Sequence, residues 1–159
     1  MDAKVNDIRI SAAHLNDLPA LIAIENDCFK SDRLSPRQMR YMLTRAKAIS
    51  WQARSLADAK TVGYSACLTP VLSRPARLYS LAVLPHYRGR GIAGRLIEKN
   101  LQTLKKMGYR SCHLEVRKTD QAAQRLYEKH GFTRVGMLSG YYEDGEDGIK
   151  MICKLKVEK

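Results

Sequence analysis

Residues 78–96 read Leu-Tyr-Ser-Leu-Ala-Val-Leu-Pro-His-Tyr-Arg-Gly-Arg-Gly-Ile-Ala-Gly-Arg-Leu in a chain of 159 residues. The apolar run from Leu78 to Leu84 predicts a strand that is buried on both faces. The glycines that follow predict a turn, and the apolar spacing from Ile92 predicts an amphipathic helix that Gly108 ends. A helix start exposes unpaired backbone N–H groups, and glycines let an anion approach them. The stretch therefore predicts a strand, a phosphate-binding turn and a helix.

Several interpretations of this turn compete. A nucleotide-binding Walker A loop ends in Gly-Lys-Ser/Thr, whereas Gly94 is followed by Arg95 and Leu96, so an NTPase is not expected. The spacing Gly-x-Gly-x-x-Gly at residues 89–94 formally matches the dinucleotide fingerprint. That fingerprint opens a long series of strands and helices, but only 65 residues follow Gly94 and four elements precede it. Another alternative is a glycine-rich turn that binds no ligand.

A third pattern, Arg/Gln-x-x-Gly-x-Gly/Ala, also fits residues 88–93. In this pattern the chain resembles the GNAT superfamily of acetyl-CoA-dependent N-acetyltransferases. The resemblance implies that the turn holds the pyrophosphate of coenzyme A and that main-chain groups of the preceding strand pair with its pantetheine arm. The implied cofactor-binding residues here are Leu81, Ala82, Val83, Arg88, Gly89, Arg90, Gly91, Ile92, Ala93 and Gly94. It also implies an α/β (α+β) fold in one domain, residues 1–159, with a mixed sheet of six to seven strands and about four helices.

A second motif of the same family lies at residues 120–132, where the family reads Asn-x-x-Ala, then Leu-Tyr, then Gly-Phe. The matching residues are Ala123, Leu126, Tyr127, Gly131 and Phe132. Asp120 stands where the family commonly has an asparagine that hydrogen-bonds the pantetheine. A carboxylate accepts hydrogen bonds but cannot donate them, so a plain helix cap is an equal alternative for Asp120. The resemblance assigns Asp120, Tyr127 and Lys129 to cofactor binding.

Two further residues are candidates for catalysis. Residues 114–117, Leu-Glu-Val-Arg, resemble the fifth strand of ribosomal-protein-alanine N-acetyltransferases. In those enzymes a glutamate on this strand is the base and a tyrosine twelve residues later is the acid, which implies these roles for Glu115 and Tyr127. The alternatives are that Glu115 faces solvent or pairs with Arg117, and that Tyr127 belongs to the core.

The acceptor site is also implied by resemblance. Residues 140–147 resemble the terminal hairpin of N-terminal acetyltransferase catalytic subunits, where paired tyrosines, here Tyr141 and Tyr142, hold the backbone of the acceptor peptide. The loop at 29–34 normally forms one wall of the acceptor site, and its expected contacts are Phe29, Asp32 and Arg33. Because this loop lacks the aromatic, Pro-containing form usual in the ribosomal enzymes, a lysine, a polyamine or another small-molecule amine is the alternative acceptor.

Charge and composition limit the kinds of ligand that the chain is expected to bind. The net charge is +12, and residues 74–129 contain 13 Lys/Arg against 4 Asp/Glu, which suits a polyanion such as coenzyme A. A non-catalytic RNA- or ribosome-binding module is the alternative of another class. Nucleic acid is not expected, because the basic third of the chain lacks interleaved aromatic residues for base stacking.

The cysteines and the hydropathy bear on the compartment. The four cysteines lie about forty residues apart without a Cys-x-x-Cys pair. We therefore expect buried free thiols and no metal site. No apolar run reaches the roughly 18 to 20 residues of a membrane helix. The N-terminus, Met-Asp-Ala-Lys, carries no secretory signal pattern. We therefore expect a cytoplasmic protein that does not bind membranes.

Periodicity and turn residues predict the other elements. Strands are expected at 5–12, 49–53, 61–68, 112–116 and 149–157, and helices at 18–28, from 35 onward and at 121–130. The histidines at 86, 113 and 130 lack the spacing of a triad or a metal site, so no chemistry is assigned to them.

Overall fold

A computed structural model describes residues 7–45 and 47–156. The strands are β1 (Ile8–Ala12), β2 (Ala48–Ser55), β3 (Thr61–Leu68), β4 (Ala76–Val83), β5 (Ser111–Arg117), β6 (Phe132–Leu138) and β7 (Gly148–Lys154). The helices are α1 (Leu18–Cys28), α2 (Pro36–Thr44), α3 (Ile92–Met107) and α4 (Gln121–Lys129). Short 3-10 turns lie at Leu15–Asp17 and Pro85–Tyr87. Within the described residues, no helix is long and apolar enough to cross a lipid bilayer.

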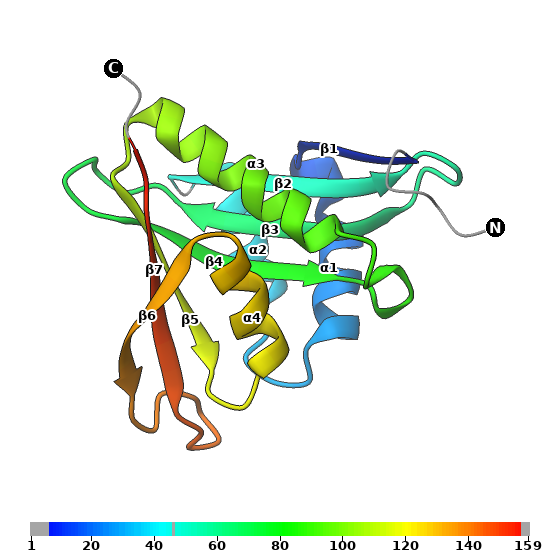
Figure 1. Cartoon of the computed structure of the whole chain (residues 1–159). Helices are drawn as coiled ribbons and strands as arrows, with labels where there is room; N and C mark the ends of the chain where they lie inside the picture. Colours follow the sequence, from blue (N-terminus) through cyan, green and yellow to red (C-terminus); the bar gives the residue numbers. More distant parts are fainter. Residues whose placement is uncertain (1–6, 46, 157–159) are drawn as a thin grey trace.

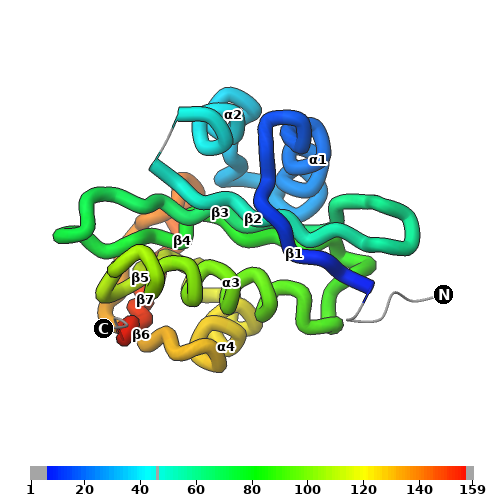
Figure 2. The backbone as a smooth tube through the Cα atoms, turned by 90° about the horizontal axis from the view of Figure 1, so that it is seen from above, coloured from blue at the N-terminus to red at the C-terminus, as the bar shows by residue number. Residues whose placement is uncertain are grey.

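The strands form one seven-stranded sheet in the order β1-β2-β3-β4-β5-β7-β6. Helices α1 and α2 lie on one face of this sheet, and α3 and α4 lie on the other (Figures 1 and 2). Every neighbouring pair is antiparallel except β4 and β5. The pairing of β4 with β5 covers only Ala76 with Cys112 and Arg77 with His113. Beyond these residues the two strands diverge and no longer pair (Figure 1), and we call this break in the strand pairing the opening.

Local chemistry explains where the helices begin and end. The Ser35 hydroxyl accepts a hydrogen bond from the Gln38 N–H at 3.1 Å, and the Gln38 side chain accepts one from the Ser35 N–H at 2.8 Å. This reciprocal cap, followed by Pro36 at the first helical position, starts α2. Helix α3 ends at Gly108, whose φ of +96° favours glycine.

Two apolar clusters form the core. One joins α1, α2 and the start of α3 to the first four strands and includes Leu21, Ile24 and Met39. The other joins α3 to β5 and β7 and includes Leu104 and Met151. Each cluster buries the apolar face that helical or strand periodicity predicts, so burial of these faces stabilises the order of the layers.

Several sequence predictions are confirmed, and some are wrong. All four cysteines are free thiols; three are buried and Cys28 is half-buried. The strand predicted at 78–84 starts earlier, at Ala76, and is not buried on both faces, because Tyr79 is 40% exposed. The strand β6 was not predicted, because it is an edge strand whose residues between Phe132 and Leu138 are exposed on both sides and lack alternation. Residues 5, 6 and 157 of the predicted end strands lie outside the described part of the chain.

A buried polar network lies between α1 and the sheet. The Glu25 carboxylate, 2% exposed, accepts hydrogen bonds from the Tyr64 hydroxyl and from the Leu34 N–H, the latter at 2.6 Å. Tyr64, which is 0% exposed, also shares a hydrogen bond with the Ser80 hydroxyl at 2.8 Å. Burial, and then the charge of Glu25, raises the pKa of Tyr64 well above its ordinary value.

This network makes the stability of the protein fall at alkaline pH. The folded protein keeps the Tyr64 proton at a pH where the unfolded chain, with a tyrosine pKa of about 10, loses it. Its contribution to stability is complete below pH 10 and falls above it, by up to about 1.4 kcal/mol for each pH unit. We expect Tyr64→Phe to flatten the loss of stability between pH 9 and 11, measured by urea unfolding. The control Tyr41→Phe removes the hydroxyl of a side chain that is 56% exposed and should keep the slope of the parent. A parental slope in Tyr64→Phe would contradict this account.

Candidate active site

The glycine-rich turn after β4 presents an open backbone. Gly89 and Gly91 have φ of +78° and +80°, and a Cβ at either position would meet nothing within 4 Å. Conformation, not space, therefore requires glycine at both positions. Gly91 precedes the first residue of α3 and offers no side chain to cap the helix. The first N–H groups of α3 are thus left to a ligand or to water.

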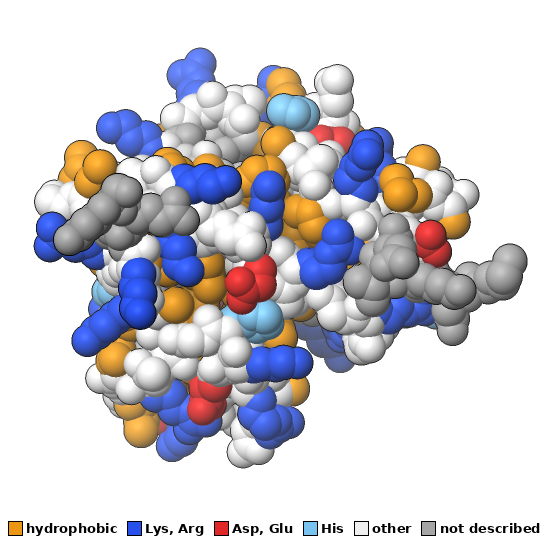
Figure 3. All heavy atoms as spheres, turned by 45° about the horizontal axis from the view of Figure 1, so that its top comes forward, with side chains coloured by type: hydrophobic (Ala, Val, Ile, Leu, Met, Phe, Trp, Pro, Cys, Tyr) orange, Lys and Arg blue, Asp and Glu red, His pale blue; other side chains and the backbone are white. Residues whose placement is uncertain are grey.

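The arginines around this turn brace it. Arg88 Nε donates to the Val83 carbonyl at 2.9 Å, which links the turn to the end of β4. Arg90 donates to the His86 carbonyl at 3.1 Å, and its guanidinium lies 5.1 Å from the Tyr87 ring centroid. Lys and Arg side chains are spread over the face formed by β1, α3 and α4 (Figure 3), so the surroundings of the turn are basic.

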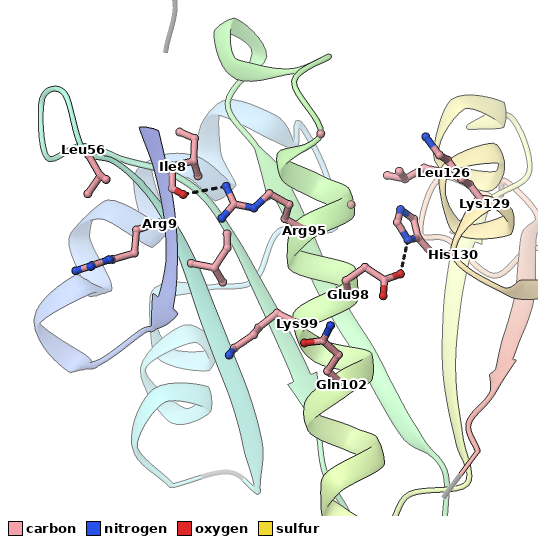
Figure 4. Close-up of a pocket in the computed structure, with 13 residues that line it drawn as sticks. Ile8, Arg9, Leu56, Arg95, Glu98, Lys99, Gln102, Leu126, Lys129 and His130 are labelled. Carbon is pink, nitrogen blue, oxygen red and sulfur yellow. Dashed lines mark hydrogen bonds and ion pairs between the residues drawn. The ribbon is translucent and has the colours of Figure 1, made fainter. Parts of the chain in front are cut away.

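A hollow of about 810 Å³ extends from this turn along α3, with walls from β1 and α4 (Figure 4). Gly91, Gly94 and Lys129, three of the expected cofactor-binding residues, line it. His130 spans the gap between α4 and α3, where its Nδ1 lies 2.6 Å from the Glu98 carboxylate. A Cβ on Gly94 would lie 2.9 Å from His130 Nε2, so only glycine lets the ring approach this closely. The sequence analysis assigned His130 no role, and the structure places it between the two helices.

The two expected catalytic residues come from opposite sides of the sheet. Glu115 lies on the face of β5 that carries α1 and α2 over the neighbouring strands, whereas Tyr127 lies on α4 and packs edge-on against Phe132, with ring centroids 5.8 Å apart. Tyr142 lies within electrostatic range of each of them. Their catalytic roles stay predictions.

The environment of Glu115 differs from both alternatives considered from the sequence. Its carboxylate, 16% exposed, pairs with Arg77 Nε at 2.9 Å, not with Arg117. Burial disfavours the charge of Arg77, but the attraction of Glu115 outweighs it and raises the pKa of the guanidinium. Arg77 also donates to the Tyr141 hydroxyl at 3.2 Å. Sequence reasoning missed Arg77, because nothing in the local sequence shows that β4 brings it beside Glu115.

Tyr127 and Asp120 are placed on the other side of the opening. Burial, and then the charge of Asp120, raises the pKa of Tyr127 above its ordinary value. The phenol therefore keeps its proton and can donate a hydrogen bond, but it does not readily transfer that proton to another group. Asp120 accepts a hydrogen bond from the Ala123 N–H at 3.1 Å, so the helix-cap alternative for Asp120 is confirmed. A contact between Asp120 and coenzyme A stays a prediction.

Arg117 joins the loop between α1 and α2 to the turn between β6 and β7. Its Nη1 lies 2.6 Å from Glu146 and 2.9 Å from Asp144, and its Nη2 pairs with Asp32. The guanidinium also lies 4.2 Å from the Tyr142 ring centroid. Sequence reasoning considered Arg117 only as a partner of Glu115; the acidic cluster of the hairpin was the signal that could have found this role.

The remaining residues expected at the acceptor site have different surroundings. Arg33 turns back to the end of α1, where it donates to the carbonyls of Asn26 and Phe29. Phe29 packs against the first apolar cluster. Tyr141 and Tyr142 contact each other edge to face, with centroids 5.0 Å apart, beside Arg77 and Arg117. The structure thus brings Asp32, Tyr141 and Tyr142 together. Phe29 instead packs into the apolar core, and Arg33 hydrogen-bonds to the end of α1.

Two of the carboxylates that pair with Arg117 have lowered pKa values. The Glu146 N–H, and then Arg117, lower the pKa of Asp144; the Thr119 hydroxyl, and then Arg117, lower the pKa of Glu146. Because the folded pKa values lie below the unfolded ones, the contribution of both carboxylates to stability is present above about pH 4.5 and is lost only at lower pH.

Replacing Arg117 should loosen both segments. In Arg117→Met the carboxylates of Asp32, Asp144 and Glu146 would face one another without a cation. We expect trypsin to cut the loop after Lys30 or Arg33 about tenfold faster at pH 8 than in the parent. The control Arg134→Met removes an exposed arginine of β6 that pairs with Glu128 of α4, and it should leave this rate unchanged. Equal rates in parent and Arg117→Met would show that Arg117 does not hold the loop.

Comparison with known proteins decides the family. The sequence matches the acetyltransferase (GNAT) family over residues 18–132. The chain belongs to the GNAT acetyltransferase family. This confirms the resemblance drawn from the glycine turn and from the second motif, and the mixed sheet with its four helices confirms the predicted fold class.

Individual GNAT relatives cover different shares of the chain. The ribosomal protein bS18-alanine N-acetyltransferase of Escherichia coli K12 is 30% identical over 163 residues, 93% of this chain and 98% of that protein. The N-alpha-acetyltransferase of Saccharolobus solfataricus is 42% identical over 83 residues, 52% of this chain and 50% of that protein. The crystal structure of the ribosomal-protein-S18-alanine N-acetyltransferase from Escherichia coli superposes with a TM-score of 0.85 at 27% identity, covering 96% of each chain. The chain thus spans about half the length of the first curated relatives it matches.

Proposed function

We propose that this chain is an acetyl-CoA-dependent N-acetyltransferase that acetylates the N-terminal α-amine of a protein or peptide. Residues 1–159 would form the single catalytic domain, and a ribosomal protein is the first acceptor to test, since the Escherichia coli relative carries that name. The observation that carries the proposal is the opening between β4 and β5, with Glu115 on one side, Tyr127 on the other and Tyr142 interacting with both.

The residues around the opening fit coenzyme A. The uncapped start of α3, preceded by two glycines with positive φ and open space above them, suits a diphosphate. Main-chain N–H groups of Gly89, Gly91, Ile92, Ala93 and Gly94, together with the charges of Arg88, Arg90 and Lys129, would hold the phosphates. The backbone of Leu81, Ala82 and Val83, which has no strand partner on the β5 side among the described residues, would pair with the pantetheine.

When bound, acetyl-CoA supplies the acetyl group as an activated thioester. The Glu115 carboxylate would take a proton from the acceptor amine, directly or through water. Main-chain N–H groups near Val83 would stabilise negative charge on the carbonyl oxygen. The Tyr127 hydroxyl would donate a hydrogen bond to the leaving sulfur, in keeping with its raised pKa. Direct attack requires no covalent enzyme intermediate.

The free-energy cost of deprotonation favours an α-amine over a lysine as the acceptor. An α-amine with a pKa of about 7.7–8.0 is substantially neutral near pH 7.5, whereas a lysine with a pKa of about 10.4 must give up its proton at a cost of about 4 kcal/mol. Glu115 is already paired with Arg77, which makes it a weak base for the larger task. Arg117 places the two segments expected at the acceptor site side by side, and this supports a peptide as acceptor.

The test compares two peptides of one sequence that begins with alanine and contains an internal lysine. One peptide has a free N-terminus and the other is blocked there. After incubation with the full chain and acetyl-CoA, mass spectrometry should find the acetyl group only on the free α-amine. Acetylation of the lysine in both peptides, or of a polyamine instead of either, would replace this function with the alternative acceptor class. No transfer to any amine would refute the proposal.

A further inference from the structure

Part of the sheet face around Glu115 is not covered. Helices α1 and α2 lie over the β1–β4 side of the sheet, and no described helix covers the same face of β5 and β7 (Figure 2). Arg77 and Tyr79 of β4 share this face with Glu115, since side chains two residues apart point the same way. Lys150 of β7 is directly opposite Glu115. Arg77 and Lys150 therefore lie on the same face as Glu115, the proposed base, and Arg117 with its three acidic partners shares this face.

Arg77 also connects Glu115 to a second hollow, of about 420 Å³, between α2 and the turn from β3 to β4. Its walls are mostly apolar, from Tyr41, Leu68 and two prolines, and Lys47, Arg74 and Arg77 provide its charges. None of the described residues that line it is acidic. We call the surface formed by Lys47, Arg74, Arg77 and Lys150 the basic trough.

Most of this charge is not neutralised within the chain. Lys47, Arg74 and Lys150 have no acidic partner among residues 7–45 and 47–156. Only Arg77 has one, Glu115. Burial and then Lys150 lower the pKa of His113 on the same face, so this histidine adds no charge at neutral pH. The basic trough therefore has a net positive potential beside the group that would accept the amine proton.

We infer that the basic trough binds an acidic segment of the acceptor protein, directly after its N-terminal residues. This inference rests on the proposed function, because an amine at Glu115 places the following residues of the acceptor over Arg77. Carboxylates at those positions would pair with Arg77 and Arg74, and an apolar side chain would fit the hollow beside Tyr41. A basic segment would meet like charges at the same positions. The trough thus selects acceptors by the charge of the residues after the acetylated terminus.

The test uses three fluorescent peptides that share their first two residues and carry glutamate, glutamine or lysine at positions three to six. Fluorescence anisotropy with the full chain should show the glutamate peptide binding at least about tenfold more tightly than the lysine peptide at 50 mM salt. The difference should shrink at 500 mM salt because ions screen exposed charges. Equal affinities for the two peptides at low salt would overturn the inference.

Matched variants locate the preference. Lys47→Gln/Arg74→Gln should reduce it by about threefold or more, whereas Lys105→Gln/Lys106→Gln, with the same loss of charge on α3 across the sheet, should keep it. An undiminished preference in Lys47→Gln/Arg74→Gln would show that the trough does not bind the segment. Acetylation of the glutamine peptide in the same samples tests the proposed function separately. Its absence would refute that function, while the order of the affinities still decides the role of the trough.

Discussion

Replacing Glu115 by glutamine should lower kcat for an alanine-initiated peptide by at least about 100-fold, within the range of about 10²–10⁴ for the loss of a general base. Glutamine keeps the size of the side chain and a carbonyl oxygen that can still accept the Arg77 hydrogen bond, now 2.9 Å long. The variant should therefore fold, and bind coenzyme A, as the parent does. Steady-state kinetics at pH 7.5, with calorimetry for coenzyme A, separates loss of catalysis from loss of binding.

The control for this change is Glu128→Gln. Glu128 is 46% exposed on α4, where it pairs with Arg134 of the edge strand β6. We expect its kcat to stay within twofold of the parent, since exposed ion pairs contribute little. If Glu115→Gln also kept its kcat within about threefold, Glu115 would be a structural partner of Arg77 and another group would accept the proton. Tyr127→Phe would then be the next variant to measure.

The largest loss of stability is expected for Glu25→Ala, at about 3–5 kcal/mol, because the change breaks a buried charged network and leaves a cavity. The variant leaves the Leu34 N–H and the Tyr64 hydroxyl without their acceptor in a region where the carboxylate is only 2% exposed. An unsatisfied buried donor costs about 1–3 kcal/mol by itself. Urea unfolding followed by circular dichroism measures the loss.

Asp27→Ala is a matched control, since Asp27 lies two residues further along α1 and is exposed. Its free energy of unfolding should stay within about 0.5 kcal/mol of the parent. A loss below about 1 kcal/mol in Glu25→Ala would mean that water replaces the carboxylate in the network. In that case the loop that begins after Cys28 would not depend on Glu25 for its position.

Short-range features of the fold could be predicted from the sequence. The turn at Gly89 and Gly91, the helix start at Ser35 and the helix end at Gly108 all depend on backbone conformation or on a cap within three residues. Such interactions are encoded by neighbours in the chain, and the family motifs repeat them at fixed spacing. The edge strand β6 was missed because an edge exposed on both sides imposes no alternation.

The sequence by itself determined the fold class, the glycine turn and the identity of Glu115 and Tyr127 as candidates, because each depends on local periodicity, on local backbone geometry or on a family motif. Only the tertiary structure decided what these side chains contact. Arg77 is 38 residues from Glu115, and Arg117 is 85 residues from Asp32. Pairs of this kind form because the sheet order places β4 beside β5 and because two loops converge at the end of β5, and neither arrangement leaves a signal in the sequence around any one residue.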